Sequence, residues 1–130
     1  MIGLVLVTHA GLAHELLAAA EMIVGPLELA EAVGIKPGDQ VDDIRISIER
    51  AIGKVNSEGV VLMTDMFGGT PSNMSLSFLE DNRVEVLTGV NLPMLIKFFN
   101  DRNRCGISEL AAQIKDCGRE SISVAGDYLR

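Results

Sequence analysis

The sequence has 130 residues, of which 48% are hydrophobic and 22% are charged, and its formal net charge is −7. This is the composition of a globular chain long enough to bury a core, and we expect a single domain over residues 1–130. The negative charge and the lack of a basic stripe exclude a nucleic-acid-binding protein. The N-terminal run MIGLVLV is too short to span a bilayer and no basic region precedes it, so we expect a soluble, cytoplasmic protein without a signal peptide.

The first part of the chain is expected to form a strand, a helix and a second strand. Residues 2–8 (IGLVLVT) are a short β-branched run, which predicts a strand buried on both faces. Residues 11–25 are rich in Ala and Leu and predict a helix with one apolar stripe, made of Leu12, Leu16, Ala19, Ala20 and Ile23. Residues 27–35 suit a helix or a strand, and we assign a strand because a βα unit must return to its sheet.

The middle of the chain begins with the turn KPGD, in which Asp39 is the expected N-cap of the next helix. That helix is clearly amphipathic, because apolar residues recur at spacings of 3, 4, 4 and 3: Val41, Ile44, Ile48, Ile52 and Val55. Residues 59–64 (GVVLMT) predict the third strand. Pro71 then opens another helix, whose inward side chains are expected to be Met74, Phe78 and Leu79.

The last part of the chain contains a further strand and two helices. Residues 84–90 (VEVLTGV) predict the fourth strand, and Asn91 is the expected cap of the helix that follows. Ser108 is the expected cap of the next helix, which carries Leu110, Ala111, Ile114 and Cys117. Residues 121–126 (SISVAG) alternate like a last, edge-type strand.

This order of elements predicts an α/β fold: a doubly wound, mostly parallel four-stranded sheet with helices on both faces, plus a fifth edge strand. In such sheets a ligand binds beyond the carboxyl ends of the strands, where the strand order reverses. Two segments there carry unusual chemistry, THAG (8–11) after the first strand and DMFGGTPSN (65–73) after the third. These strands are neighbours in the common doubly wound orders, so we expect the two segments to face each other.

His9 follows the first predicted strand at this edge of the sheet. A neutral imidazole can act as a nucleophile when a partner holds its N–H, so that the other ring nitrogen presents a lone pair. Asp65 ends the third strand at the matching height, and its carboxylate can hold His9 and stabilise the charge that develops on the ring. Taken alone, His9 is equally consistent with a helix-capping or exposed residue, and Asp65 with an N-cap or an Asx turn.

The segment after Asp65 has the composition of an anion-binding turn. Gly68 and Gly69 let the backbone approach a ligand closely and adopt positive φ. Thr70 and Pro71 open a helix, whose N–H groups and dipole favour an anion, and the Thr70 hydroxyl adds a donor. Gly-Gly alone is common in turns. Together with the acid, the hydroxyl, the proline and a facing histidine, it predicts an anion cradle beside a nucleophile.

Other chemistries lack their motifs in this sequence. GxxxxGK[ST], GxGxxG and GxSxG are absent, which argues against a P-loop NTPase, a dinucleotide-binding domain and a serine hydrolase. His9 and His14 do not form HExxH, and Cys105 and Cys117 lack CxxC spacing, so we expect free thiols and neither a metal nor a cofactor. What remains is a histidine beside an acid and an anion cradle, a group that could accept a phosphoryl group and pass it on.

Three separated stretches, GLVLVTHAGLAHELLAAAEMIVG, GVVLMTDMFGGTPSN and VLTGVNLPML, carry a family resemblance. Over essentially its whole length the chain resembles the IIA proteins of the mannose/fructose/sorbose family in the bacterial phosphoenolpyruvate-dependent sugar phosphotransferase system. The resemblance implies that the carrier HPr phosphorylates His9, which then phosphorylates a IIB protein. It places Asp65 as the acid that orients the ring and Thr70 as the hydroxyl that contacts the phosphoryl group.

The resemblance also implies a homodimer, in which the last strand, at residues 121–126, is antiparallel and exchanged between subunits. Met66 stands where some family members have a hydroxyl residue, so one phosphoryl contact of those members is missing here. Because the chain ends at Arg130 without a fused IIB domain, we expect the acceptor to be a separate protein. Two alternatives remain open: a regulatory IIA phosphoprotein without a sugar permease, and a non-catalytic anion-binding module. The short chain disfavours a third, the phosphocarrier part of a dihydroxyacetone kinase system.

Overall fold

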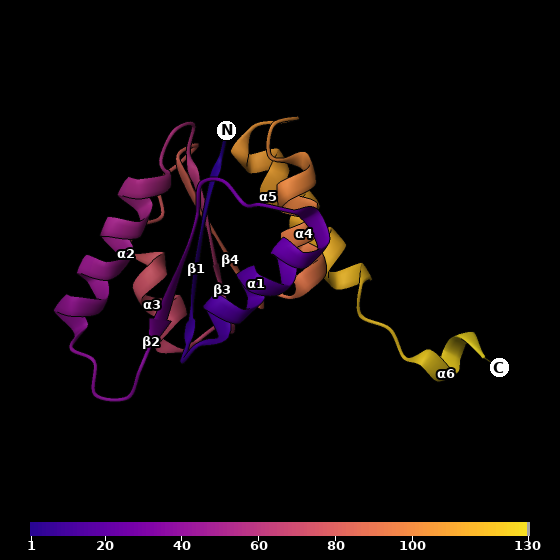
Figure 1. Cartoon of the computed structure of the whole chain (residues 1–130), viewed down its shortest axis with the longest axis horizontal. Coiled ribbons are helices and arrows are strands. Elements are labelled where there is room, and N and C mark those ends of the chain that lie inside the picture. Colours follow the sequence, from indigo (N-terminus) through magenta and orange to yellow (C-terminus); the bar gives the residue numbers. More distant parts are fainter. Residues whose placement is uncertain (130) are drawn as a thin grey trace.

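A computed structural model describes residues 1–129, in which four strands form one parallel sheet in the order β2-β1-β3-β4 (Figure 1). The strands are β1 (Gly3–His9), β2 (Ala30–Ile35), β3 (Val60–Thr64) and β4 (Val84–Thr88). From β1 the chain moves outward to β2, then returns to β3 on the other side of β1, so the strand order reverses between β1 and β3. This confirms the predicted doubly wound parallel sheet, with its first and third strands as neighbours.

Helices cover both faces of the sheet, as predicted. Their bounds are α1 (Leu12–Val24), α2 (Val41–Val55), α3 (Thr70–Leu76), α4 (Leu92–Asp101), α5 (Ile107–Glu120) and α6 (Ala125–Tyr128). Figure 1 shows α2 and α3 on one side of the sheet and α1, α4 and α5 on the other, while α6 stands apart. The sheet therefore has a core on each side.

The alternation of side chains along β1 explains why its sequence is a continuous apolar run. Leu4 and Leu6 belong to the core formed with α1, α4 and α5, whereas Val5 and Val7 belong to the core formed with α2. A strand covered on both faces has no solvent-facing position for a polar side chain. The same reasoning applies to β3, whose five residues are all buried.

α1 buries only part of the predicted stripe, since Ala20 lies in the core and Leu16 packs against it while other members are exposed. Ala13 and Ala20 are fully buried, whereas Leu12 and Ile23 are 45% and 59% exposed. Most residues of this helix are apolar, so hydrophobicity alone does not define the face that packs on the sheet. Leu79, expected to point inward, is also exposed, because α3 has already ended before it.

Of three predicted helix caps, one is confirmed and two are wrong. Asn91 caps α4, where its side chain accepts a hydrogen bond from a backbone N–H of the first turn. Asp39 accepts a hydrogen bond within its own turn instead, and Gln40 occupies the N-cap of α2. α5 begins at Ile107, which is buried in the core, so Ser108 lies inside the helix and is not its N-cap.

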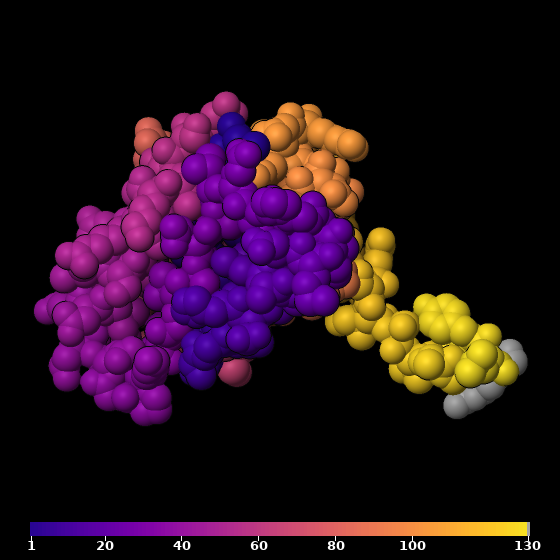
Figure 2. Space-filling model, in the orientation of Figure 1, coloured from indigo at the N-terminus to yellow at the C-terminus, as the bar shows by residue number. Residues whose placement is uncertain are grey.

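The expected strand at residues 121–126 is not a strand in this chain. Residues 122–124 have no regular structure and α6 follows them, in a segment that extends away from the body (Figure 1; Figure 2). Ile122 and Val124, whose alternation favoured a strand, are 76% and 63% exposed. A strand needs a backbone partner, and nothing within residues 1–129 pairs with this segment. Exchange of this strand in a dimer stays a prediction.

Candidate active site

His9 is the last residue of β1 rather than a loop residue, so the sheet itself places it at the carboxyl edge. Asp65 follows β3, whose last residue, Thr64, pairs with Val7 of β1. The two side chains meet there, because His9 Nδ1 lies 2.7 Å from Asp65 Oδ2. The structure thus brings together the two residues that the sequence singled out.

The Asp65 carboxylate accepts hydrogen bonds from backbone as well as ring. His9 N–H donates to Oδ2 at 3.0 Å, and Met66 N–H donates to Oδ1 at 3.1 Å. Burial raises the pKa of Asp65, but the hydrogen bonds from the backbone and ring of His9 outweigh it and hold this pKa below its ordinary value. Asp65 is therefore ionised at neutral pH and holds the imidazole from one side.

The contact with Asp65 decides which nitrogen of His9 is available for chemistry. A carboxylate can accept a hydrogen bond but cannot donate one. In the neutral ring the proton therefore lies on Nδ1 and the lone pair on Nε2. The side chain of His9 is 51% exposed, whereas that of Asp65 is 14% exposed. A partner can therefore reach the ring while the acid that orients it stays covered.

The three residues predicted to form the anion cradle differ in what they contribute. Gly68 has φ +86°, which favours glycine, but open space surrounds it. Gly69 has an ordinary φ of −86°, and its role is spatial, since a Cβ there would lie 2.9 Å from His9 Cε1. Thr70 is the first residue of α3 and lines a cavity together with His9. The turn is thus built closely around the imidazole.

Thr8 also positions His9, although it was not among the predicted site residues. Its buried hydroxyl accepts from Ala13 N–H at 2.7 Å and donates to the His9 carbonyl at 3.1 Å, so the end of β1 is tied to the start of α1. Gly34 on β2 lets the chain after His9 approach, because a Cβ at Gly34 would collide with the Ala10 carbonyl. A threonine between an apolar run and a helix is a recognisable capping signal and could have been noted.

A cavity of about 400 Å³ opens beside His9. His9 and Ala10 come from the end of β1, residues 35–39 from the end of β2, and Thr70 from the start of α3. Lys36, in the turn after β2, is the one lysine among these lining residues. Only the segments after the first and third strands were predicted to form the site. The turn after β2 was not included, and it lies on the other side of β1.

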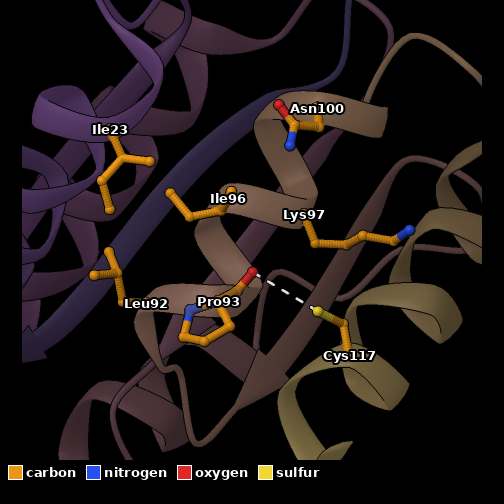
Figure 3. A pocket seen from close by; sticks show the side chains of 7 residues that line it. All are labelled: Ile23, Leu92, Pro93, Ile96, Lys97, Asn100 and Cys117. Atoms are coloured by element: carbon orange, nitrogen blue, oxygen red, sulfur yellow. Dashed lines mark hydrogen bonds between the residues drawn. The ribbon is translucent and has the colours of Figure 1, made fainter. Parts of the chain in front are cut away.

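A second hollow, about 460 Å³ in volume, lies between helices on the other face of the sheet. Figure 3 shows its lining: Ile23, Leu92, Pro93, Ile96, Lys97, Asn100 and Cys117. Two of its polar groups are engaged within the chain, since Lys97 Nζ lies 2.6 Å from Asp101 Oδ2 and Cys117 Sγ donates to the Pro93 carbonyl at 3.8 Å. It holds no histidine–acid pair and is not a candidate for the same chemistry.

Residues 1–129 contain neither a cluster of metal ligands nor a helix that could span a membrane. No three His, Cys, Asp or Glu side chains in this part of the chain gather closely enough to hold a metal ion. None of its helices combines the length and the apolar character needed to cross a membrane. Cys105 and Cys117 are free thiols, as expected.

Comparison with known proteins identifies the family. The family model described as "PTS system fructose IIA component" matches residues 3–115, where PTS denotes the phosphotransferase system. The chain belongs to this family. It is a IIA component of the mannose/fructose/sorbose type, a class of phosphotransferase proteins in sugar transport, and the predicted resemblance is confirmed. The match includes both His9 and Asp65.

Individual relatives agree with this assignment. The chain is 29% identical over 131 residues to a fructose-specific EIIA component of Bacillus subtilis, with 99% of this chain and 90% of that protein covered. It is 31% identical over 124 residues to a mannose-specific EIIAB component of Escherichia coli, covering 93% of this chain but only 38% of that protein. An EIIA crystal structure from Streptococcus agalactiae superposes with a TM-score of 0.89 at 25% identity, covering 98% of this chain and 99% of that one.

Proposed function

We propose that this IIA protein carries a phosphoryl group on Nε2 of His9, accepting it from the phosphohistidine of HPr and passing it to a IIB protein. The observation that carries the proposal is the 2.7 Å contact of His9 Nδ1 with Asp65 Oδ2, which leaves Nε2 as the free nucleophilic nitrogen of a half-exposed ring. In this proposal the chain works as one phosphocarrier domain over residues 1–130, in the cytoplasm, where HPr is available.

The transfer balances without a cofactor. His9 Nε2 forms a new N–P bond as the N–P bond of the donor breaks, and the electron pair of the broken bond returns to the donor ring. The donor ring enters protonated on its other nitrogen and leaves as neutral imidazole. The positive charge moves to the ring of His9, where the Nδ1–H donates to the ionised Asp65.

In this proposal the turn after Asp65 binds the phosphoryl group of the phosphohistidine. Gly69 lets the backbone lie against the imidazole, and Thr70 lines the cavity beside His9. In-line phosphoryl transfer asks little covalent work of the protein, so positioning and charge stabilisation supply most of the effect. Gly68, Gly69 and Thr70 are therefore the proposed phosphoryl-binding residues.

The proposed assembly is a homodimer. The segment that leaves the body after α5 exposes Ile122 and Val124, and β4 is an edge strand of the sheet. Pairing of the segment from one subunit with the sheet of another would cover both. Light scattering at micromolar protein concentration tests this, and a monomer mass would contradict it.

Phosphorylation in vitro tests the carrier function. The protein is incubated with phosphoenolpyruvate, enzyme I and HPr, and its mass is measured. We expect one added phosphate per chain, labile to acid and stable to alkali, as for a phosphoramidate. His9→Ala should abolish the addition, while His14→Ala, an exposed position inside α1, should leave it intact. Label on His14, or on the His9→Ala variant, would show that the assignment is wrong.

A further inference from the structure

We propose that the ammonium group of Lys36 contacts the phosphoryl group on His9 and forms, with Thr70 and the glycine turn, the third wall of the phosphoryl site. The inference rests on the proposed phosphorylation of His9 and adds a residue and a charge to it. Lys36 lies in the turn after β2, which none of the sequence motifs of the site includes.

The register of the sheet places Lys36 beside His9. β1 and β2 run parallel and His9 pairs with Ile35, so Lys36 is the residue directly after the partner of His9. Ala10 N–H donates to the Ile35 carbonyl at 2.8 Å, which holds the two strand ends together beyond the last pair. Neighbouring strands lie roughly 4.8 Å apart, well within the reach of a lysine side chain.

The cavity beside His9 joins these groups in one space. Lys36, His9 and Thr70 all line it, and each comes from a different strand end or helix start at the carboxyl edge. Lys36 takes part in no ion pair within residues 1–129, so its ammonium is free to meet a ligand. The backbone of Lys36 is held in place, since its backbone N–H donates to Asp39 Oδ2 at 2.8 Å.

The positive charge of Lys36 would stabilise a phosphoryl group on His9. A phosphoryl group on His9 brings between one and two negative charges next to the ionised Asp65, and the carboxylate of Asp39 lines the same cavity. The glycine turn and the Thr70 hydroxyl supply only neutral donors. Of the cavity's lining residues within the described part of the chain, Lys36 is the one Lys or Arg, in a protein of net charge −7. It is therefore placed to offset the repulsion between phosphoryl and carboxylates.

Substitution of Lys36 tests the contact through two measurements. The first is the equilibrium fraction of phosphorylated protein in a defined mixture of HPr and phospho-HPr. The second is the ³¹P titration of the purified phosphoprotein without HPr. Lys36→Met should lower the phosphorylation equilibrium constant about fivefold and raise the pKa of the phosphoryl group by about half a unit, because a neighbouring cation favours the dianion. Lys36→Arg keeps the charge and should stay within about twofold of the wild type.

Lys54→Met is the matched control, because Lys54 is an exposed lysine in the last turn of α2, away from the cavity. It should change neither measurement. If Lys36→Met lowers the equilibrium fraction but leaves the ³¹P titration unchanged, Lys36 does not contact the phosphoryl group and the proposal is wrong. If the Lys36→Met protein gives the wild-type result in both measurements, the proposal is also wrong. Failure of the wild type to be phosphorylated would instead refute the proposed function itself.

Discussion

The cavity beside His9 and the second hollow, an apolar groove between α1, α4 and α5, have similar volumes, about 400 and 460 Å³, but differ in the state of their polar groups. In the groove, Lys97 is paired with Asp101. Figure 3 shows the Cys117 thiol bound to the backbone carbonyl of Pro93. His9 lines the cavity, and Asp65 orients its ring so that the second nitrogen remains free. A hollow indicates chemistry when its polar groups are oriented but still available, and the volume alone does not distinguish the two.

Among substitutions that keep the imidazole, the strongest effect should come from filling the space beside it. In Gly69→Ala the new Cβ would lie 2.9 Å from His9 Cε1, so the ring must move away from its position against Asp65. We expect phosphoryl transfer from phospho-HPr to slow by about 100-fold, since small displacements of a reacting group carry penalties of this size. Rapid-quench kinetics measures the rate.

Gly68→Ala is the control for this prediction, because open space surrounds Gly68 and its φ of +86° is the only obstacle to a side chain. It should lower the free energy of unfolding by about 1 kcal/mol and change the transfer rate much less than Gly69→Ala. Equal rates for the Gly69→Ala protein and the wild type would contradict the close packing around His9.

Loss of the charge on Asp65 should have the next largest effect. Asp65→Asn keeps the shape of the side chain but removes the carboxylate that stabilises a positively charged His9 ring. We expect transfer to slow by about 30-fold while His9 remains the only site of phosphorylation. A phosphopeptide map with the label still on His9, together with the reduced rate, would agree with an orienting role for Asp65.

Asp65 also predicts a dependence of stability on pH. The pKa of its carboxyl is lower in the folded protein than its ordinary value of 3.8, because the hydrogen bonds from His9 outweigh the effect of burial, which raises it. Its contribution is therefore fully present above that value and is lost as the pH falls through the folded pKa. The difference in unfolding free energy between wild type and Asp65→Asn, measured with urea, should shrink below about pH 4. A difference that grows on acidification would contradict this.

A smaller effect is expected at the wall of the cavity. Thr70→Ala removes one hydroxyl donor from the phosphoryl site and should lower the transfer rate about fivefold. Thr70→Ser keeps the hydroxyl and should retain most of the rate. If the Ala and Ser variants have the same rate, the methyl group or the start of α3 matters rather than the donor, and the proposed role of Thr70 is wrong.

Parts of this structure follow from the sequence because one physical constraint determines them. Two-sided burial makes β1 and β3 continuous apolar runs, and the usual strand order then places His9 next to Asp65. Other parts depend on information outside the local pattern. Residues 121–126 alternate as an edge strand does, but a strand forms only where a backbone partner exists. Lys36 looks like part of an ordinary turn until the register of β1 and β2 places it beside His9.

The groove should respond to substitution in the opposite way from the cavity. Ile96 is half-buried on α4 and packs against the core that α1 and α5 complete, so Ile96→Ala should lower the free energy of unfolding by about 1 kcal/mol. Because no reacting group lines the groove, the rate of phosphoryl transfer should stay within about twofold of the wild type under conditions where the variant is folded. Ile96→Val removes less volume and should have a smaller effect on stability with the same rate. Urea titration and transfer kinetics on one preparation test both expectations. A folded Ile96→Ala protein that transfers phosphate slowly would show that the groove communicates with His9 and that the two hollows are not independent.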